Sequence, residues 1–175
     1  MIELKGSNFV LRKWHPDDAA SLQKHANNIN VSRFLLDRFP FPYTLADAIN
    51  FINHKIAEET ITNFPIIING ETSGVIGVDM RQDIYRKTPL LGYWLREDYW
   101  GKGIITEAIG LITGYAFNSL DIMTIQANVL EMNPASMRAL EKAGFVKQGI
   151  LERSVIKHDQ VFDEHIYACF KPGVN

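Results

Sequence analysis

The chain has 175 residues and a mass of 19.9 kDa, with 46% hydrophobic and 22% charged residues. These proportions are those of a folded globular protein and exclude a disordered or fibrous chain. Eighteen Lys and Arg residues nearly balance 20 Asp and Glu residues, and the net charge of −2 gives no bulk attraction to nucleic acid or to an anionic membrane. The length predicts a single domain over residues 1–175, because domains commonly contain roughly 100 to 200 residues.

The start of the chain and its cysteine content favour a cytoplasmic protein. No apolar run has the length of a signal-peptide core or the roughly 20 residues of a membrane span. The single cysteine, Cys169, excludes an internal disulfide and fits a reducing compartment. We therefore expect neither a membrane nor a nucleic acid as partner. No two of the five histidines are four residues apart, so no metal site is expected either.

Hydrophobic periodicity in the first third of the chain predicts one strand and two helices. The strand is expected at residues 9–11, and a helix at 16–29 begins with Pro-Asp-Asp and carries one apolar stripe. Residues 34–43 contain two prolines and four aromatic side chains, which indicates a loop. A second helix is expected over residues 45–57, because Thr44 is a typical N-cap residue ahead of an apolar stripe.

The rest of the chain contains further strand and helix patterns. An Asn-Gly turn at residues 69–70 predicts a hairpin between its flanking strands. The expected strands cover residues 64–68, 74–80, 90–95, 122–129, 145–151 and 161–170, and the expected helices cover 106–117 and 134–143. This order predicts an α+β fold, a mixed sheet flanked by helices.

The most informative stretch, residues 91–108, reads LGYWLREDYWGKGIITEA and predicts a strand, a turn and a helix start. Gly101 and Gly103 let consecutive backbone N–H groups converge at the start of the helix. Unpaired amides and the helix dipole favour an anion there. The turn therefore indicates a phosphate ligand, and the alternative is that the two glycines only reverse the chain direction.

Two common phosphate-binding motifs do not fit this turn. A Walker loop requires Ser or Thr after its lysine, but Gly103 follows Lys102. A dinucleotide-binding fingerprint requires a third glycine where this chain has Thr106. Nucleotide hydrolysis and a Rossmann-type site are therefore disfavoured.

Two separate motifs resemble those of the GNAT acyl-CoA N-acyltransferases. The first is YWL at residues 93–95 followed by WGKGIITEA at 100–108, and the second is NPAS at 133–136 followed by LEKAGF at 140–145. Within that family the chain resembles the branch that contains the bacterial ribosomal-protein N-terminal acetyltransferases. The resemblance extends from the first predicted strand to Tyr167. It implies a GNAT-like sheet, mixed and mostly antiparallel, that splays between two strands.

The resemblance also implies an acetyl-CoA site, with coenzyme A as the product. In this family the turn after the fourth strand cradles the pyrophosphate, and the strand before it hydrogen-bonds the pantetheine arm through its backbone. Asn133 would hold the pantetheine, and Ser136 would lie near the thioester sulfur. The residues that match the family's cofactor-binding positions are Trp94, Leu95, Arg96, Trp100, Gly101, Lys102, Gly103, Ile104, Ile105, Thr106, Asn133 and Ser136.

Three positions depart from the family pattern. Ile105 places a bulky side chain where the backbone approaches phosphate, and Leu140 stands where many relatives have a tyrosine general acid. Leu90 replaces a glutamate that often serves as the base. Ser136 is then the remaining donor to the leaving thiolate, directly or through water.

Since Leu90 cannot accept a proton, the base is sought among the nearby carboxylates. Glu131 lies just before Asn133, and Asp79 lies at the end of a predicted strand. A solvated or capping role is the alternative for both. A weak or water-mediated base favours an α-amine acceptor, because an α-amine pKa of about 7.7 to 8.0 leaves more neutral amine than a lysine pKa of about 10.4.

In this family the aromatic loop at residues 34–43 would border the acceptor channel. Phe39, Phe41 and Tyr43, together with Asp79, are the expected acceptor contacts. Core packing or a lid is the alternative role for the aromatic side chains. The expected acceptor is the amine of a peptide N-terminus or of a small molecule, and a homodimer is an expectation from the family alone.

The expected reaction is direct attack of the amine on the acetyl thioester in a ternary complex, with the oxyanion held by strand amides and no covalent enzyme intermediate. Two other classes remain open at this point. One is a non-catalytic acyl-CoA-binding or sensing module on the same fold, and the other is a nucleotide-binding domain of another kind. Consumption of acetyl-CoA in the presence of an amine separates the enzyme from both.

Overall fold

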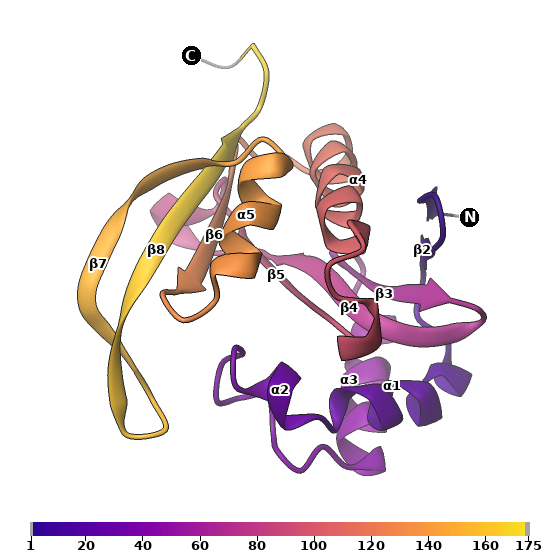
Figure 1. Cartoon of the computed structure of the whole chain (residues 1–175). Helices are drawn as coiled ribbons and strands as arrows, with labels where there is room; N and C mark the ends of the chain where they lie inside the picture. Colours follow the sequence, from indigo (N-terminus) through magenta and orange to yellow (C-terminus); the bar gives the residue numbers. More distant parts are fainter. Residues whose placement is uncertain (1, 174–175) are drawn as a thin grey trace.

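Across residues 2–173, which the computed structural model describes, eight strands form one mixed sheet with helices on both faces (Figure 1). The strands are β1 (Glu3–Lys5), β2 (Val10–Arg12), β3 (Asn63–Ile68), β4 (Glu71–Asp79), β5 (Leu90–Leu95), β6 (Thr124–Leu130), β7 (Val146–Lys157) and β8 (Gln160–Phe170). The helices are α1 (Ala19–Ala26), α2 (Ile29–Ser32), α3 (Leu45–Ala57), α4 (Ile104–Ser119) and α5 (Pro134–Lys142), with 3₁₀ turns η1 (Pro16–Asp18), η2 (Asp83–Tyr85) and η3 (Glu97–Tyr99).

The sheet is interrupted between its two middle strands. The strand order is β1-β2-β3-β4-β5-β6-β8-β7, and every neighbouring pair except β5 and β6 is antiparallel. Strands β5 and β6 are parallel and share a single register pair, Leu90 with Gln126. Beyond this pair they diverge, and Figure 1 shows β6, β7 and β8 turning away from β3, β4 and β5. The expected α+β fold, with a mostly antiparallel sheet that splays between two strands, is confirmed.

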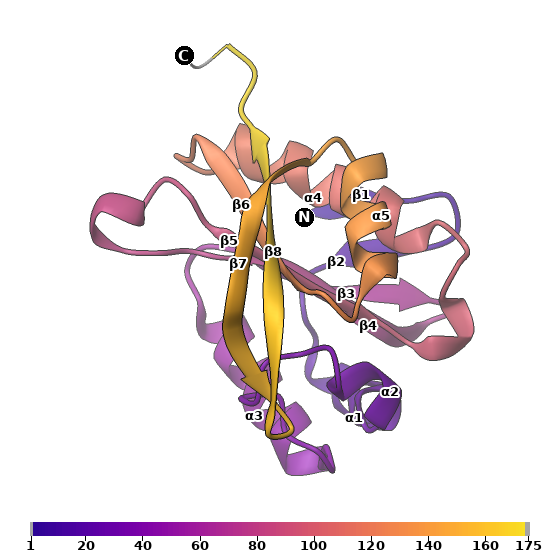
Figure 2. The same ribbon diagram turned by 60° about the vertical axis from the view of Figure 1, so that its left-hand side comes forward.

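Strands β4 and β5 contribute to two hydrophobic cores, because successive side chains of a strand point to opposite faces. Ile76 and Leu95 belong to a core cluster with residues of α4 and α5. Val75 and Trp94 belong to a second cluster with residues of α1 and α3. Figure 2 shows α1, α2 and α3 together below the sheet and α4 and α5 above it. The strand that leads into the glycine turn is thus held from both sides.

The predicted first helix is divided into separate elements. Residues Pro16–Asp18 form a 3₁₀ turn, α1 ends at Ala26, and Ile29 begins α2. Asn28 has an extended backbone with φ of −137°, and its side chain accepts a hydrogen bond from the amide of Asn30. Asn28 therefore caps a new helix, which ends the apolar stripe of the first.

The C-terminal hairpin is longer than the sequence pattern indicates. Strand β7 continues to Lys157, past a polar stretch where the predicted strand ends, and its register against β8 shifts between Leu151 and Val155. At this bulge Arg153 has a φ of 50°, and its amide donates to Asp163 Oδ1 over 2.8 Å. The Asp163 carboxylate thus accepts the hydrogen bond that a backbone carbonyl would accept in a regular ladder. Hydrophobic periodicity does not reveal such a contact. The short strand β1, which pairs with β2, also lies outside the predicted set.

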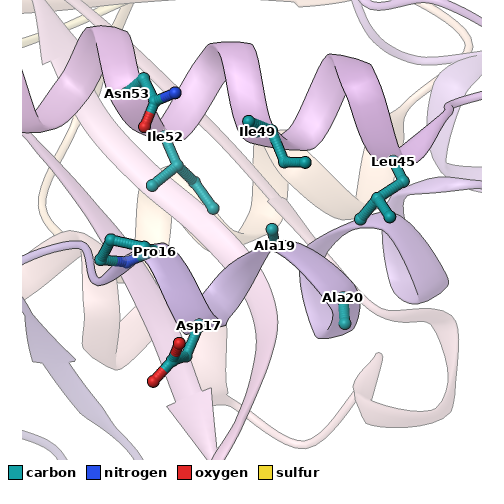
Figure 3. A pocket seen from close by; sticks show the side chains of 8 residues that line it. All are labelled: Pro16, Asp17, Ala19, Ala20, Leu45, Ile49, Ile52 and Asn53. Atoms are coloured by element: carbon teal, nitrogen blue, oxygen red, sulfur yellow. The ribbon is translucent and has the colours of Figure 1, made fainter.

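An apolar groove lies between η1–α1 and α3, away from the residues that the motifs implicate. Figure 3 shows its walls, which are formed by Pro16, Asp17, Ala19, Ala20, Leu45, Ile49, Ile52 and Asn53. The groove is therefore not the site that the sequence predicts. Within the described part of the chain, none of the helices is long and apolar enough to cross a membrane.

Candidate active site

The glycine turn between β5 and α4 is open on its outer side. Gly101 and Gly103 have φ of 73° and 79°, in the left-handed region that favours glycine. A Cβ placed on either glycine would meet no neighbouring atom of the described chain within 4 Å. Gly103 is the N-cap of α4 and provides no capping side chain, so the amides of the first turn face outward as donors. This arrangement suits an anion at the positive end of a 16-residue helix.

Two cationic side chains flank the turn. Lys102 is exposed, and its Nζ lies 5.2 Å from the centre of the Tyr99 ring. The Arg96 guanidinium pairs with Asp98 over 2.6 Å and holds the pKa of that carboxyl below its usual range. The backbone amide of Arg96 donates to the carbonyl of Ser73 in β4 over 2.7 Å, so the main chain at Arg96 is still paired with the sheet. Lys102 is thus the cation available to a ligand directly on the turn.

Hydrophobic residues fix both ends of the turn. The indole Nε1 of Trp100 donates to the carbonyl of Leu95 over 2.6 Å, while 41% of the residue stays exposed. Ile104 is buried in the core cluster beneath α4, Ile105 packs against the same cluster, and Thr106 is half-buried beside them. Because the bulk of Ile105 is directed at the core, it does not crowd the outer side of the turn.

Backbone groups of β5 face the splay at alternate residues. Since the amide of Arg96 is bonded to β4, the backbone groups of Tyr93 and Leu95 face the opposite edge, from which β6 has diverged. The carbonyl of Leu95 is occupied by Trp100. The family resemblance predicts this role for residues 94–96 as a run. Alternation along the strand restricts the role to Leu95 within that run and extends it to Tyr93.

The start of α5 meets β5 across the splay. Asn133 is the N-cap of α5, and its Oδ1 accepts a hydrogen bond from the amide of Ser136 over 3.2 Å. The hydroxyls of Ser136 and Tyr93 lie 2.7 Å apart. Burial raises the pKa of Tyr93 to about 12, so this phenol keeps its proton at neutral pH. One polar contact therefore joins the two sequence motifs.

Tyr93 is a candidate functional residue that is not among the site residues predicted from the sequence. Its signal is its place in the YWL motif, because alternation places it on the same face as Leu95, towards α5. Leu140, where many relatives have a tyrosine, is fully buried in the core. The hydroxyl next to Ser136 therefore comes from the strand instead of from the helix.

Both carboxylates considered as the base have partners. One Glu131 oxygen accepts a hydrogen bond from the amide of Asp163 over 3.0 Å, and the amide of Glu131 donates to the Asp163 carbonyl. Asp79, at the end of β4, is half exposed and pairs with Arg38 over 2.6 Å. Among residues 2–173, neither carboxylate is hydrogen-bonded to Ser136, and no three His, Cys, Asp or Glu side chains are grouped to hold a metal ion.

The aromatic loop packs on the face of β5 opposite to Ser136. Phe39 stacks on Tyr43 with ring centres 4.9 Å apart and lies edge-on to Trp94 at 6.0 Å. Tyr43 is buried, which raises its pKa to about 12, whereas Phe41 is 50% exposed. The structure therefore brings Phe39 and Tyr43 together with Trp94 and leaves Phe41 at the surface.

Two adjacent charges connect this loop to distant elements. Asp37 pairs with Lys157 at the tip of the β7–β8 hairpin over 2.6 Å, and Arg38 pairs with Asp79 of β4 over 2.6 Å. The Lys157 side chain is 7% exposed, and its ammonium holds the pKa of Asp37 below its usual range. Figure 1 shows the hairpin extending downward to the level of α2, and the Asp37–Lys157 pair connects its tip to the loop. The loop thus links the two halves of the splayed sheet.

The comparisons with known proteins identify the family. A profile described as an acetyltransferase (GNAT) domain matches residues 8–146. The chain belongs to the GNAT acetyltransferase family. Among curated relatives of this GNAT chain, the probable N-acetyltransferase YjcK of Bacillus subtilis is 46% identical over 87 residues, which are 49% of this chain and 48% of YjcK. The uncharacterized N-acetyltransferase p20 of Bacillus licheniformis is 27% identical over 98% of this chain and 97% of p20.

Solved structures share the fold. RimL, a ribosomal L7/L12 alpha-N-protein acetyltransferase in complex with coenzyme A, superimposes with a TM-score of 0.85 over 97% of this chain and 98% of RimL, at 18% identity. The alignment with YjcK spans about half the length of that protein. The GNAT family inferred from the two motifs is confirmed.

Replacing Lys157 by Met is expected to loosen the aromatic loop, because the aliphatic stem is retained while the ion pair with Asp37 is lost. Chymotrypsin should then cleave within residues 34–43 several-fold faster than in the unmodified protein, as followed by mass spectrometry. Lys87→Met, which removes the exposed ion pair with Asp121, is the control and should leave the cleavage rate unchanged. Equal cleavage rates in both variants would show that the Asp37–Lys157 pair does not hold the loop.

Proposed function

We propose that this GNAT protein transfers an acetyl group from acetyl-CoA to a primary amine, preferentially the α-amine of a peptide N-terminus or of a small molecule. One observation carries this proposal. Ser136 of the second motif lies 2.7 Å from Tyr93 of the first, beside the splay between β5 and β6. The splay, the glycine turn and the start of α5 would thus border one gap, along which an extended thioester arm would bind.

The chain's own residues fit the acetyl donor along this gap. The amides from Gly101 to Thr106 would bind the pyrophosphate, since the turn is open and the helix start carries no capping side chain. Lys102 adds a positive charge beside them. The backbone groups of Tyr93 and the backbone amide of Leu95, whose carbonyl is occupied by Trp100, would bind the pantetheine arm. Asn133 uses its Oδ1 as the helix cap, so its Nδ2 remains a donor for the same arm.

When bound, acetyl-CoA supplies an activated acetyl thioester. The amine nitrogen forms a bond to the acetyl carbon, and the carbon–sulfur bond breaks with its electron pair on sulfur. The hydroxyl of Ser136 donates a hydrogen bond to the developing thiolate. The proton of the amine nitrogen passes to water or to Glu131, which borders α5, and the released thiolate takes a proton from water.

The preference for an α-amine is supported by Leu90, which stands where many relatives have a glutamate base and which cannot accept a proton. At pH 7 about a tenth of an α-amine is neutral, against less than about a thousandth of a lysine side chain. RimL is named as an alpha-N-protein acetyltransferase, which supports an N-terminal acceptor. Phe39, Phe41 and Asp79 would contact this acceptor on the side of the aromatic loop.

Release of coenzyme A thiol tests the proposal. With acetyl-CoA at pH 7.0, lysine-free peptides with free N-termini should give a kcat/KM at least about tenfold above that of Nα-acetylated lysine peptides, because more of the α-amine is neutral. A panel of small primary amines covers the other acceptor class. A lysine peptide or polyamine as the best acceptor would contradict the α-amine proposal. Binding of acetyl-CoA by calorimetry without release of thiol to any amine would instead support the non-catalytic binding module.

A matched pair of glycine substitutions tests the pyrophosphate site. Gly103→Ala should raise the KM for acetyl-CoA about tenfold, because an alanine at φ of 79° is strained and the turn must shift. Gly110→Ala, in the middle of α4 with open space around it, should leave that KM unchanged. An unchanged KM in both variants, measured by thiol release, would contradict pyrophosphate binding at the turn.

A further inference from the structure

The Tyr93 hydroxyl contacts Ser136 at two of its oxygen atoms. The Tyr93 hydroxyl lies 2.7 Å from Ser136 Oγ and 3.5 Å from the carbonyl oxygen of Ser136. The carbonyl oxygen of Ser136 can only accept a hydrogen bond. The phenol proton therefore has two acceptors on Ser136, the carbonyl oxygen and the nearer Oγ. A phenol is also a stronger donor than an aliphatic alcohol, because it is much more acidic. Both hydroxyls can donate in the short contact, and the acidity of the phenol together with the nearby carbonyl oxygen favours Tyr93 as the donor.

We propose that Tyr93 is a positioning residue for departure of the thiol: it donates to Ser136 Oγ and thereby leaves the proton of Ser136 free to point at the sulfur. This inference rests on the proposed function. The amine nitrogen still bonds to the acetyl carbon, and the carbon–sulfur bond still breaks with its electron pair on sulfur. Tyr93 and Ser136 both keep their protons throughout. The proton of the amine goes to water or to Glu131, as in the proposed function, and the released thiolate takes one from water.

Three features of the described residues hold this arrangement in place. Asn133 Oδ1 accepts from the amide of Ser136, which fixes the backbone at the first turn of α5. Tyr93 extends from β5, and its ring packs against the main core cluster. Its burial raises the pKa of the phenol to about 12, so the phenol remains a donor over the whole pH range of an enzyme assay. The serine hydroxyl thus has a fixed donor on one side and a free proton on the other.

The arrangement also accounts for the departure at Leu140. A tyrosine at that position would have to leave the core, because Leu140 is fully buried. In this chain the phenol approaches from the strand and touches the serine. Its effect on the sulfur therefore passes through Ser136, so the two residues should act as a unit.

The test compares Tyr93→Phe, Ser136→Ala and the double variant by thiol release. Tyr93→Phe keeps the ring and removes only the hydroxyl. Its kcat should fall about tenfold, the order expected for the loss of one hydrogen bond, while the KM for acetyl-CoA stays within about twofold. Adding Tyr93→Phe to Ser136→Ala should lower kcat no further. Tyr85→Phe is the matched control, because Tyr85 is exposed on η2 with its ring under Arg81, and it should behave as the unmodified protein.

The outcomes separate this inference from the function on which it depends. An unchanged kcat for Tyr93→Phe overturns the inference. So does a double variant whose fold-loss in kcat equals the product of the losses in the two single variants. A rise in KM together with a lower Tm would show that the Tyr93 hydroxyl supports the fold and not the departure of the thiol. If Ser136→Ala retains full activity, the role of Ser136 is wrong. If the unmodified protein releases no thiol with any amine, the proposed function itself fails.

Discussion

The arrangement of the candidate site depends on the divergence of two parallel strands. β5 and β6 are joined at one end by the register pair of Leu90 with Gln126 and by hydrogen bonds from the amides of residues 123, 124 and 126 to the carbonyls of Lys87 and Pro89, and beyond this end the strands separate. A parallel strand that loses its neighbour leaves one row of N–H and C=O groups without a ladder partner. In this chain the backbone groups of Tyr93 and Leu95 stand in that row. The opening is therefore polar along its β5 edge, and an amide-bearing arm can replace the missing strand.

The opening persists because both halves of the sheet are held by other contacts. β5 is paired with β4 along its whole length and has side chains in both core clusters. β6 is paired with β8 over seven positions, and the β8–β7 hairpin reaches back to the aromatic loop through Lys157 and Asp37. The loop is fixed in turn to β4 through Arg38 and Asp79. These links connect the two halves around the gap without closing it.

Much of the fold could be predicted from local patterns, because those patterns reflect burial and turn geometry. The Asn-Gly turn at residues 69–70 has φ of 51° and 80° and joins β3 to β4 as expected. The helix at 45–57 begins at its Thr44 cap with the bounds predicted. The predicted length of β7 is too short, because a bulge held by Asp163 interrupts the alternation before the strand ends at Lys157.

The candidate site was predictable where its residues are adjacent in sequence, as in the glycine turn. It was not predictable where two distant segments meet. Tyr93 has no sequence signal for contact with Ser136, 43 residues away, until the fold places α5 on that face of β5. The same holds for Asp37 and Lys157, which are 120 residues apart. No local sequence pattern links the members of either pair, and each contact is created by the tertiary structure.

Amide hydrogen exchange with and without coenzyme A is the most direct test of the central claim, that the splay and the glycine turn form one binding site. Coenzyme A should slow exchange at residues 93–95, 101–106 and 133–136 together, because these backbone groups border the same gap. Exchange in α3, which lines the apolar groove, should stay unchanged. Protection confined to the groove between α1 and α3, or no protection at the glycine turn with the protein saturated by coenzyme A, would contradict this account.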